Sequence, residues 1–96
     1  MIGQVAYEWN PAKAAANLHK HGVSFTEAAS VFLDPMALTF DDPDHSEGEH
    51  REITIGVSAR QRALFLAHCV RGNRIRIISA RRATPQESEH YGKNIG

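Results

Sequence analysis

The sequence alternates between apolar and polar residues through three consecutive segments, and no other feature restricts the fold as strongly. The segments cover residues 51–59, 62–71 and 74–82, and they are joined at Arg60-Gln61 and at Gly72-Asn73. Alternation with a period of two predicts β-strands, and connections this short join antiparallel neighbours. The sequence therefore predicts a three-stranded antiparallel meander at the centre of the fold.

The turns also predict which residues share a face of the meander, because the first turn would place Ala59 opposite Arg62. One predicted face is apolar, and we expect the helices to cover it. It contains Ile53, Ile55, Val57, Leu64, Leu66, His68, Val70, Ile75 and Ile77, and it ends in Arg81. The other face is mixed, and it is expected to bring Glu52 near Arg76 as an ion pair.

Helix start and stop signals precede the meander. After a short strand expected at residues 4–9, Asn10-Pro11 supplies an N-cap and a proline at the first helical position, and Gly22 supplies a left-handed stop. Ser24-Phe25-Thr26-Glu27 has the pattern of a capping box, which predicts a second helix that runs to about Phe32.

The remaining segments complete an expected β-α-α-β-β-β-β-α order. A strand at residues 36–40 and an acidic loop at residues 41–49 lead into the meander, and Thr84-Pro85-Gln86-Glu87 opens a short last helix. This order predicts an α+β fold in which two N-terminal helices pack on a twisted antiparallel β-sheet, with a short C-terminal helix. We expect residues 1–96 to form a single domain.

The charges are divided unevenly along the chain, although the formal net charge is zero. Residues 1–50 carry two basic and eight acidic side chains, whereas residues 51–96 carry nine basic and three acidic ones. All the basic residues of the second half except Lys93 are arginines, whose planar group binds phosphate bidentately and stacks on bases. The basic half therefore favours an RNA or phosphate surface, with solvated strand faces as the alternative.

The predicted register sorts these arginines into two groups at opposite ends of the sheet. Arg60, Arg62, Arg81 and Arg82 share one end, and Arg51, Arg71, Arg74 and Arg76 share the other. In the second group Arg71 would face Arg74 across a strand pair, where like charges repel. That end therefore requires a phosphate, a carboxylate or an acidic partner nearby.

Composition excludes several other classes of protein. No stretch approaches the ~20 apolar residues of a membrane span, and residues 1–10 lack the basic start and apolar run of a secretion signal. We therefore expect a soluble, cytoplasmic protein that does not bind membranes. Cys69, the single cysteine, lies in an alternating apolar segment and is expected to be a buried small side chain.

Several segments, taken in order, resemble the BrnT family. They are Tyr7-Glu8-Trp9-Asn10, residues 17–25 (NLHKHGVSF) with Glu27-Ala28, Asp34-Pro35, Glu49-His50-Arg51, Ile55-Gly56 and residues 74–83 (RIRIISARRA). Together they span about residues 7 to 91, and their order and spacing make the resemblance specific.

This resemblance implies a RelE-like fold and a ribonuclease toxin of a type II toxin-antitoxin system, which inhibits translation by cutting RNA. It also implies a protein partner, a BrnA-like antitoxin with a ribbon-helix-helix domain, which neutralises the toxin. Operator DNA would be contacted only through that antitoxin. The expected enzyme is a metal-independent endoribonuclease with no cofactor.

Cleavage of RNA without a metal requires a base for the 2′-hydroxyl proton, an acid for the leaving oxygen and cations around the phosphorane-like transition state. We expect the catalytic residues to be Lys20, His21, Arg60 and Arg81, and the RNA-binding residues to be Trp9, Arg51, Arg62 and Arg82. Among these, His21 carries an imidazole, the side chain most often used as a general acid or base.

Each candidate also has a structural explanation. Lys20 and His21 would complement the dipole at the end of the first helix, and the arginines could bind RNA or a partner without taking part in chemistry. Trp9 is explained more simply by packing in the core. His68, on the apolar face, is expected to be a hydrogen-bonded core histidine.

No metal site is expected from the spacing of the histidines. His19 and His21 are two residues apart and so point to different sides of a helix, and His45 and His50 flank the acidic loop without a recognisable ligand spacing.

Two hypotheses about function remain open. The first is the endoribonuclease, which should arrest growth and degrade RNA. The second is a non-catalytic module that binds its antitoxin and tunes repression of the operon; it is motivated by residues 87–91, which are less basic than the resemblance implies.

Overall fold

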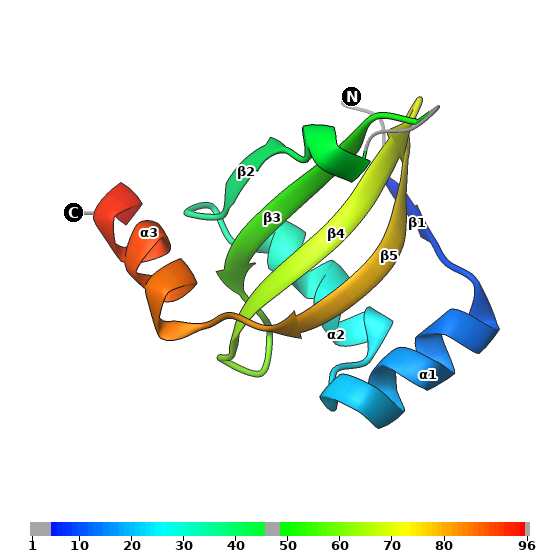
Figure 1. Ribbon diagram of the computed structural model, residues 1–96, viewed down its shortest axis with the longest axis horizontal. Helices are drawn as coiled ribbons and strands as arrows, with labels where there is room; N and C mark the ends of the chain where they lie inside the picture. Colours follow the sequence, from blue (N-terminus) through cyan, green and yellow to red (C-terminus); the bar gives the residue numbers. More distant parts are fainter. Residues whose placement is uncertain (1–4, 46–48, 96) are drawn as a thin grey trace.

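The computed structural model describes residues 5–45 and 49–95, and it has the predicted order of elements (Figure 1). The elements are β1 (Ala6–Glu8), α1 (Pro11–His21), α2 (Phe25–Ser30), the 3-10 turn η1 (Val31–Leu33), β2 (Leu38–Asp41), the 3-10 turn η2 (Pro43–His45), β3 (Arg51–Val57), β4 (Ala63–Arg71), β5 (Arg74–Arg82) and α3 (Pro85–Ile95). Gln4 of the expected first strand and residues 46–48 of the expected acidic loop lie outside the described residues.

Short-range signals in the sequence predicted the helix ends well. The Asn10 side chain accepts hydrogen bonds from the backbone N–H groups of Ala12 and Lys13, and Gly22 ends α1 in the left-handed conformation at φ 69°. Thr84 and Glu87 form a complete capping box, in which each side chain accepts a hydrogen bond from the other residue's backbone N–H. α3 runs to Ile95, which makes it as long as α1.

The five-stranded sheet is mixed, which corrects the prediction of an antiparallel sheet. The strand order is β1-β5-β4-β3-β2, and β1 pairs in parallel with β5, with Ala6 opposite Arg74. The other three strand pairs are antiparallel. Hairpin turns determine the direction of neighbouring strands only, whereas β1 is separated from β5 by most of the chain.

The register between β3 and β4 differs from the prediction by one residue. Val57 lies opposite Ala63, and the N–H of Ser58 donates to the carbonyl of Arg62, so the loop is longer than two residues. Gln61 turns this loop with a positive φ of 64°. A shift of one residue moves every side chain of a strand to the other face. Ile53 and Ile55 therefore lie on the face opposite to Leu64 and Leu66, not beside them as predicted.

A second irregularity changes the face of Arg81. His68 lies opposite Ile77 and Ala67 lies opposite Ser79, so β5 carries one extra residue, Ile78, at this point. Beyond this bulge the side chains of β5 alternate out of phase with the simple pattern. Arg81 consequently lies opposite Phe65, on the face away from α1 and α2, which corrects the predicted position of this arginine.

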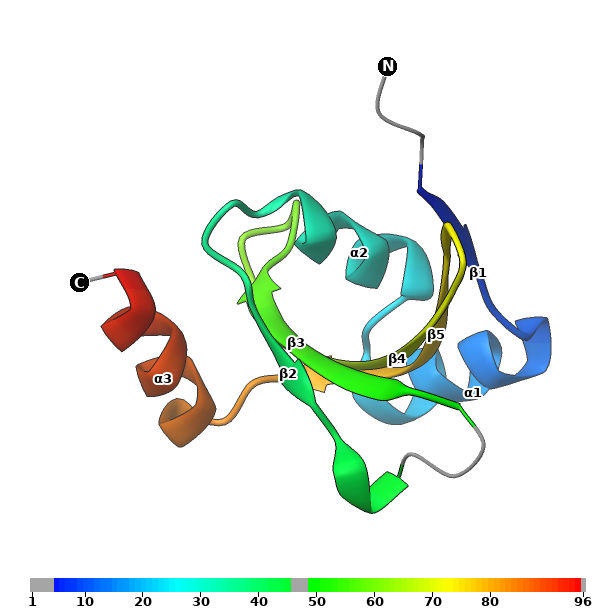
Figure 2. The ribbon, with the colours of Figure 1, turned by 90° about the horizontal axis from the view of Figure 1, so that it is seen from above.

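These two shifts give the sheet an apolar cluster on each face. The cluster under the first two helices contains Val23, Phe25, Ala28, Val31, Leu64, Leu66, Ile77 and Ala80. The cluster on the other face contains Ile53, Ile55 and Ala67, with Phe65, Ile78, Ala83 and Tyr91 packed against it. Figure 2 shows α2 inside the curve of the sheet and α3 outside it. Helices therefore cover both faces, where only one covered face was expected.

The predictions for Cys69 and for membrane-spanning segments can also be compared with the structure. Cys69 is buried with a free thiol, as expected. None of the helices in the described part of the chain has the length and hydrophobicity that crossing a membrane requires.

Candidate functional site

One end of the sheet brings together the last turn of α1, the β3–β4 loop and the end of β5. Asn17 holds these parts in place, because its side-chain amide donates to the carbonyls of Val23 and Ala80, at 2.9 and 2.8 Å, and accepts from the N–H of Ala80 at 3.1 Å. Asn17 is buried, so all three bonds are protected from water. The C-terminal turn of α1 is therefore fixed against the end of β5.

A buried ion pair between Glu27 and Arg62 lies at the centre of this end. Arg62 binds both carboxylate oxygens of Glu27 and donates to the carbonyl of Gly22 at 3.0 Å, while the hydroxyl of Ser58 donates to Glu27 at 2.7 Å. The side chain of Glu27 is only 4% exposed. Its hydrogen bonds with Arg62, first, and with Ser58 outweigh burial and lower the pKa of the Glu27 carboxyl.

This ion pair differs from the predicted role of Glu27 as the second half of a capping box. Ser24 does cap α2, accepting from the N–H of Glu27 at 3.0 Å, but the Glu27 side chain turns to Arg62. Arg62, expected to bind RNA, is thus committed to an internal carboxylate and a carbonyl, and its hydrogen bonds with Glu27 raise the pKa of its guanidinium.

Four other basic residues lie on the segments that meet at the Arg62 ion pair, and we call them the basic corner: Lys20, His21, Arg60 and Arg82. Lys20 and His21 precede Gly22, whose carbonyl Arg62 binds, and Arg82 pairs across the strand with Leu64. Arg60 is 71% exposed, with its nearest nitrogen 3.8 Å from Glu27. Arg82 is exposed and makes no ion pair or side-chain hydrogen bond with the described part of the chain.

A hollow of about 240 Å³ lies between α1 and β5 beside the basic corner. Lys20 and His21 line it on the helix side together with Lys13, and Ile78 and Ser79 line it on the strand side. The hollow is open to solvent and has basic groups on its rim. An anionic ligand could therefore enter it without displacing an internal salt bridge.

Arg81 has a different environment, on the opposite face of the sheet. Its two terminal nitrogens donate to the two carboxylate oxygens of Glu87, at 2.8 and 2.9 Å, and its guanidinium lies 4.0 Å from the centre of the Phe65 ring. The bond with Arg81 is the main cause of the lowered pKa of Glu87. Arg81 therefore joins β5 to the first turn of α3.

The remaining two predicted RNA-binding residues lie outside the basic corner. Trp9 packs edge-on against Phe25, with ring centres 6.0 Å apart, and borders the main apolar cluster. Arg51 lies at the other end of the sheet, 3.8 Å from the carboxylate of Asp42. Trp9 therefore makes the core-packing contacts that were the alternative to RNA binding.

At the other end of the sheet, carboxylates lie beside the arginines of the second group, which are Arg51, Arg71, Arg74 and Arg76. A nearby acid was expected there, because Arg71 faces Arg74 across the strand pair. Arg71 binds Glu49, and Glu8 lies 3.9 Å from Arg74 and 3.4 Å from Arg76. Arg76 consequently pairs with Glu8, whereas an ion pair with Glu52 was predicted. The two ends of the sheet therefore differ at Arg82, because an internal acid lies near each arginine of the second group, whereas Arg82 has no carboxylate partner among the described residues.

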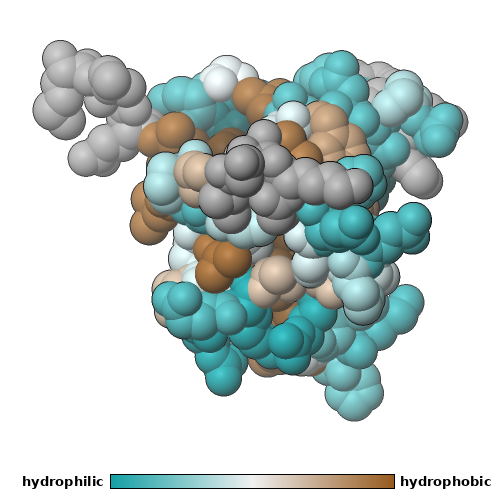
Figure 3. All heavy atoms as spheres, turned by 90° about the vertical axis from the view of Figure 1, so that its left-hand side faces the viewer, coloured by the Kyte–Doolittle hydropathy of each residue, from teal (hydrophilic) through white to brown (hydrophobic). Residues whose placement is uncertain are grey.

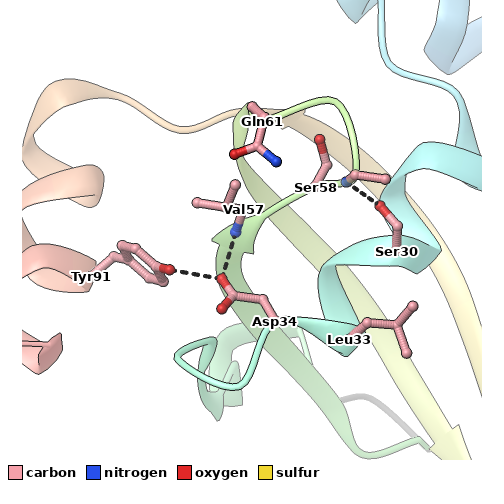
Figure 4. A pocket seen from close by; sticks show the side chains of 8 residues that line it. Ser30, Leu33, Asp34, Val57, Ser58, Gln61 and Tyr91 are labelled. Atoms are coloured by element: carbon pink, nitrogen blue, oxygen red, sulfur yellow. Dashed lines mark hydrogen bonds between the residues drawn. The ribbon is translucent and has the colours of Figure 1, made fainter.

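A larger pocket, of about 490 Å³, lies between η1 and α3 (Figure 4). It was not predicted from the sequence. At its wall the carboxylate of Asp34 accepts hydrogen bonds from the N–H groups of Met36 and Val57 and from the hydroxyl of Tyr91. Burial raises the pKa of Asp34, but these bonds outweigh it and lower the pKa overall. No arginine, lysine or histidine is among the lining residues. In the sequence, Asp34-Pro35 was noted among the segments that resemble the BrnT family, without a contact for the Asp34 side chain.

Figure 3 shows the surface of the molecule on the α3 side, coloured by hydropathy. Hydrophobic side chains reach it in separate patches, and hydrophilic side chains dominate the lower part, which is the end of the molecule that carries the β3–β4 loop. A charged ligand would therefore meet a polar surface at that end.

His68 is the buried histidine that was predicted. Its Nε2 atom shares a 2.7 Å hydrogen bond with the hydroxyl of Thr54, and the Phe32 ring packs edge-on against it. Burial lowers the pKa of His68 to about 4, so the imidazole is neutral at neutral pH.

Comparisons with known proteins agree with the fold. The family model described as "Ribonuclease toxin, BrnT, of type II toxin-antitoxin system" matches residues 9–87. The 1.1 Å crystal structure of the Brucella abortus ribonuclease toxin BrnT superimposes with a TM-score of 0.67 at 20% sequence identity, covering 84% of this chain and 99% of that one. At this identity the superposition shows a shared fold. The search of proteins with curated functions finds no match.

Proposed function

The chain belongs to the BrnT family of ribonuclease toxins of type II toxin-antitoxin systems, and from this premise we propose that it is a metal-independent endoribonuclease that cuts RNA at the basic corner. In this proposal residues 1–96 act as one toxin domain in the cytoplasm, and cleavage of RNA inhibits translation.

The observation that carries the proposal is the group of accessible cations around a salt bridge that is already satisfied. Because Arg62 neutralises Glu27, the carboxylate does not compete strongly for Arg60, and Arg82 has no carboxylate partner in the described residues. Cations in such an arrangement can bind successive phosphates and stabilise the charge that develops on a phosphorane-like transition state.

We assign roles to the members of the basic corner. His21 takes or returns the proton, since imidazole is the side chain most often used for proton transfer to or from a reacting group, and Lys20 and Arg60 stabilise the transition-state charge. Arg82 holds a neighbouring phosphate. Arg62 acts indirectly, by positioning Gly22 and the loop that carries Arg60.

Arg81 keeps its proposed catalytic role only if it can exchange Glu87 for phosphate. Arg81→Ala should then abolish cleavage, and Glu87→Gln, which releases the guanidinium, should leave cleavage intact or increase it. If both substitutions lower stability and neither changes the cleavage rate of the folded protein, Arg81 is a structural residue. Trp9 and Arg51 lie outside the basic corner. If they contact RNA, as proposed, they bind nucleotides beyond those held at the corner.

The test is cleavage of RNA by the purified chain, freed of antitoxin, with and without ribosomes and in the presence of EDTA. We expect cleavage in EDTA, and its loss in His21→Ala. His19→Ala is the matched control, because His19 is an exposed histidine on the same turn of α1 that points elsewhere. RNA that stays intact under all these conditions would exclude the enzyme.

A second pair of variants tests phosphate binding. Arg82 and Arg74 are exposed arginines at the two ends of β5, and Glu8 lies close to Arg74 only. We expect Arg82→Ala to weaken RNA binding and to reduce its dependence on salt, and Arg74→Ala to change neither greatly. Equal losses in the two variants would argue for diffuse attraction instead of a site.

The proposed protein partner is a BrnA-like antitoxin with a ribbon-helix-helix domain, through which the complex would contact operator DNA. Such an antitoxin would neutralise the toxin by covering the basic corner. We expect the complex to protect RNA from cleavage. Complex formation that leaves cleavage unchanged would contradict this mode of inhibition.

The alternative is a non-catalytic module that binds the antitoxin and tunes repression. The observation in its favour is that Arg62 and Arg81 are both bound to internal carboxylates. It predicts a stable complex with antitoxin but no growth arrest when the chain is expressed alone. Growth arrest that disappears in His21→Ala would exclude it.

A further inference from the structure

Three side chains form one row across neighbouring strands at the end of the sheet far from the basic corner. Asp41 of β2 lies opposite Glu52 of β3, and Glu52 lies opposite His68 of β4. Residues directly opposite each other point to the same face. His50, two residues before Glu52, joins them, with its Nε2 atom 3.0 Å from Asp41 Oδ1 and 3.6 Å from Glu52 Oε2.

Each of Asp41, His50 and Glu52 offers one potential ligand atom, and these atoms all lie within 4.8 Å of one another. The ligands of a tetrahedral zinc ion, at metal distances near 2 Å, are separated by roughly 3.3 Å. The distances of 3.0 and 3.6 Å from His50 to the two carboxylates bracket that value. The three groups are therefore spaced for one ion without movement of the strands.

His68 supplies an independent observation. Its side chain is 2% exposed, and its Nδ1 atom has no hydrogen-bond partner among the described residues. This atom lies 3.9 Å from Glu52 Oε1, so the bare nitrogen faces the cluster. Buried ring nitrogens usually have a partner, and a metal ion bound at the cluster would give this nitrogen one.

The other nitrogen of His68 is already held. Nε2 shares a hydrogen bond with Thr54, and the Thr54 hydroxyl shares another with Thr39, both at 2.7 Å. A hydrogen bond at one ring nitrogen is the usual second-shell device that orients a histidine toward a metal through the other nitrogen. The Thr39–Thr54–His68 chain thus has the arrangement of an outer shell.

We propose that Asp41, His50, Glu52 and Nδ1 of His68 bind a divalent transition-metal ion of the zinc type. Two imidazoles and two carboxylates are a donor set that suits zinc, whereas calcium and magnesium prefer oxygen ligands alone. Glu52 presents one oxygen to each histidine, and a turn of its half-buried carboxylate opens the position for Nδ1 of His68. The ion would cross-link β2, β3 and β4, and it would stabilise the fold without entering the chemistry of the basic corner.

The experiment is a zinc titration of the full chain, without a histidine tag and after removal of metals by a chelator. Calorimetry gives the affinity, and the ¹⁵N signals of the histidine rings identify the ligating nitrogens. We expect one zinc per chain, shifts of His50 Nε2 and His68 Nδ1, and a higher melting temperature. Zinc that shifts neither histidine, or His50 alone, overturns the assignment.

Variants at Asp41 and His50, whose side chains are more than half exposed, keep the test independent of folding, and Thr54→Val, at a buried position, conserves the shape of the side chain. Asp41→Asn and His50→Ala should each weaken zinc binding by more than about 100-fold, beyond the loss typical of an outer-shell residue, and Thr54→Val by roughly 10- to 100-fold. Asp42→Asn is the matched control, since Asp42 is adjacent in sequence but lies toward Arg51. Binding that survives in His50→Ala, or that falls equally in Asp42→Asn, would refute the site. RNA cleavage in EDTA is a separate readout, so failure of this proposal leaves the nuclease proposal testable.

Discussion

At the scale of single residues, Glu27 shows how a buried charge organises the candidate site. It binds Arg62 and Ser58, and both the β3–β4 loop and the end of α1 depend on these bonds. A buried ion pair contributes little net stability compared with apolar packing, but removing one partner leaves the other charge uncompensated. The pair is therefore more important for positioning the cations around it than for overall stability.

Glu27→Gln should expose this dependence. We expect the free energy of unfolding to fall by about 3 kcal/mol, because Arg62 keeps its charge and loses its carboxylate. Urea denaturation measures the loss, with Glu89→Gln on the exposed side of α3 as a control of small effect. A similar, small effect of both substitutions would mean that water replaces the carboxylate at Arg62.

Gly56 is a second residue with a specific structural requirement. A Cβ atom there would lie 2.8 Å from Val31 Cγ1 and 3.0 Å from Ala37 Cβ, so η1 packs directly on the β3 backbone. Gly56→Ala should lower the free energy of unfolding by roughly 1 to 3 kcal/mol through overpacking. Thermal unfolding gives the value, and an unchanged melting temperature would show that η1 moves away easily.

At the scale of elements, the attachment of α1 to β5 determines where Lys20 and His21 lie. Asn17 makes the side-chain hydrogen bonds that join the two elements, and it does so from the only buried position in α1. α1 is otherwise largely exposed, so few apolar contacts would hold it if these bonds were lost.

Asn17→Ala tests this attachment. We expect a loss of about 3 kcal/mol, because the carbonyls of Val23 and Ala80 and the N–H of Ala80 would lose their partner in a buried place. Asn10→Ala, which removes only the N-cap of the same helix, should cost about 1 kcal/mol. Hydrogen exchange should accelerate throughout α1 in Asn17→Ala. Equal costs would indicate that the helix docks by other contacts.

At the scale of the whole molecule, three carboxylates connect the helices to the sheet. Glu27 links α2 to the start of β4, Asp34 links η1 to β3 and α3, and Glu87 links α3 to β5. The pKa of each carboxyl is lower than its ordinary value, which is 4.5 for Glu27 and Glu87 and 3.8 for Asp34. Burial raises each pKa, but the hydrogen bonds that the carboxylate accepts lower it by more.

These shifts predict the response to acid. A carboxyl with a lowered pKa in the folded state contributes its full stability above its unfolded pKa and loses that contribution as the pH falls through the folded value. We therefore expect stability to begin to fall below about pH 6.5, where the unfolded chain protonates His68 and the folded chain does not, and to fall further below about pH 4.5 as the three carboxyls lose their contribution. Circular dichroism across the acid range measures it, and Glu27→Gln should flatten the fall. A variant curve parallel to that of the wild type would assign the acid sensitivity to other groups.

Local interactions account for what the sequence determined by itself. The ends of α1 and α3 were predicted because caps and stops depend on residues three or four positions apart, and the meander was predicted from its alternation and turns. The gathering of Arg60, Arg62 and Arg82 at one end of the sheet followed from the same pattern. The family was also recognised from the sequence, because its segments keep their order and spacing.

Only the tertiary structure decided which side chains meet. The loop at Gln61 and the bulge at Ile78 each shift a strand by one residue, and a shift of one residue exchanges the two faces. These shifts move Arg81 onto Phe65 and place Glu52 beside His68, and the direction of β1 likewise depended on contacts distant in sequence. Register and ion pairing are set by packing across the whole sheet, so no local pattern could have separated the accessible arginines from the bound ones.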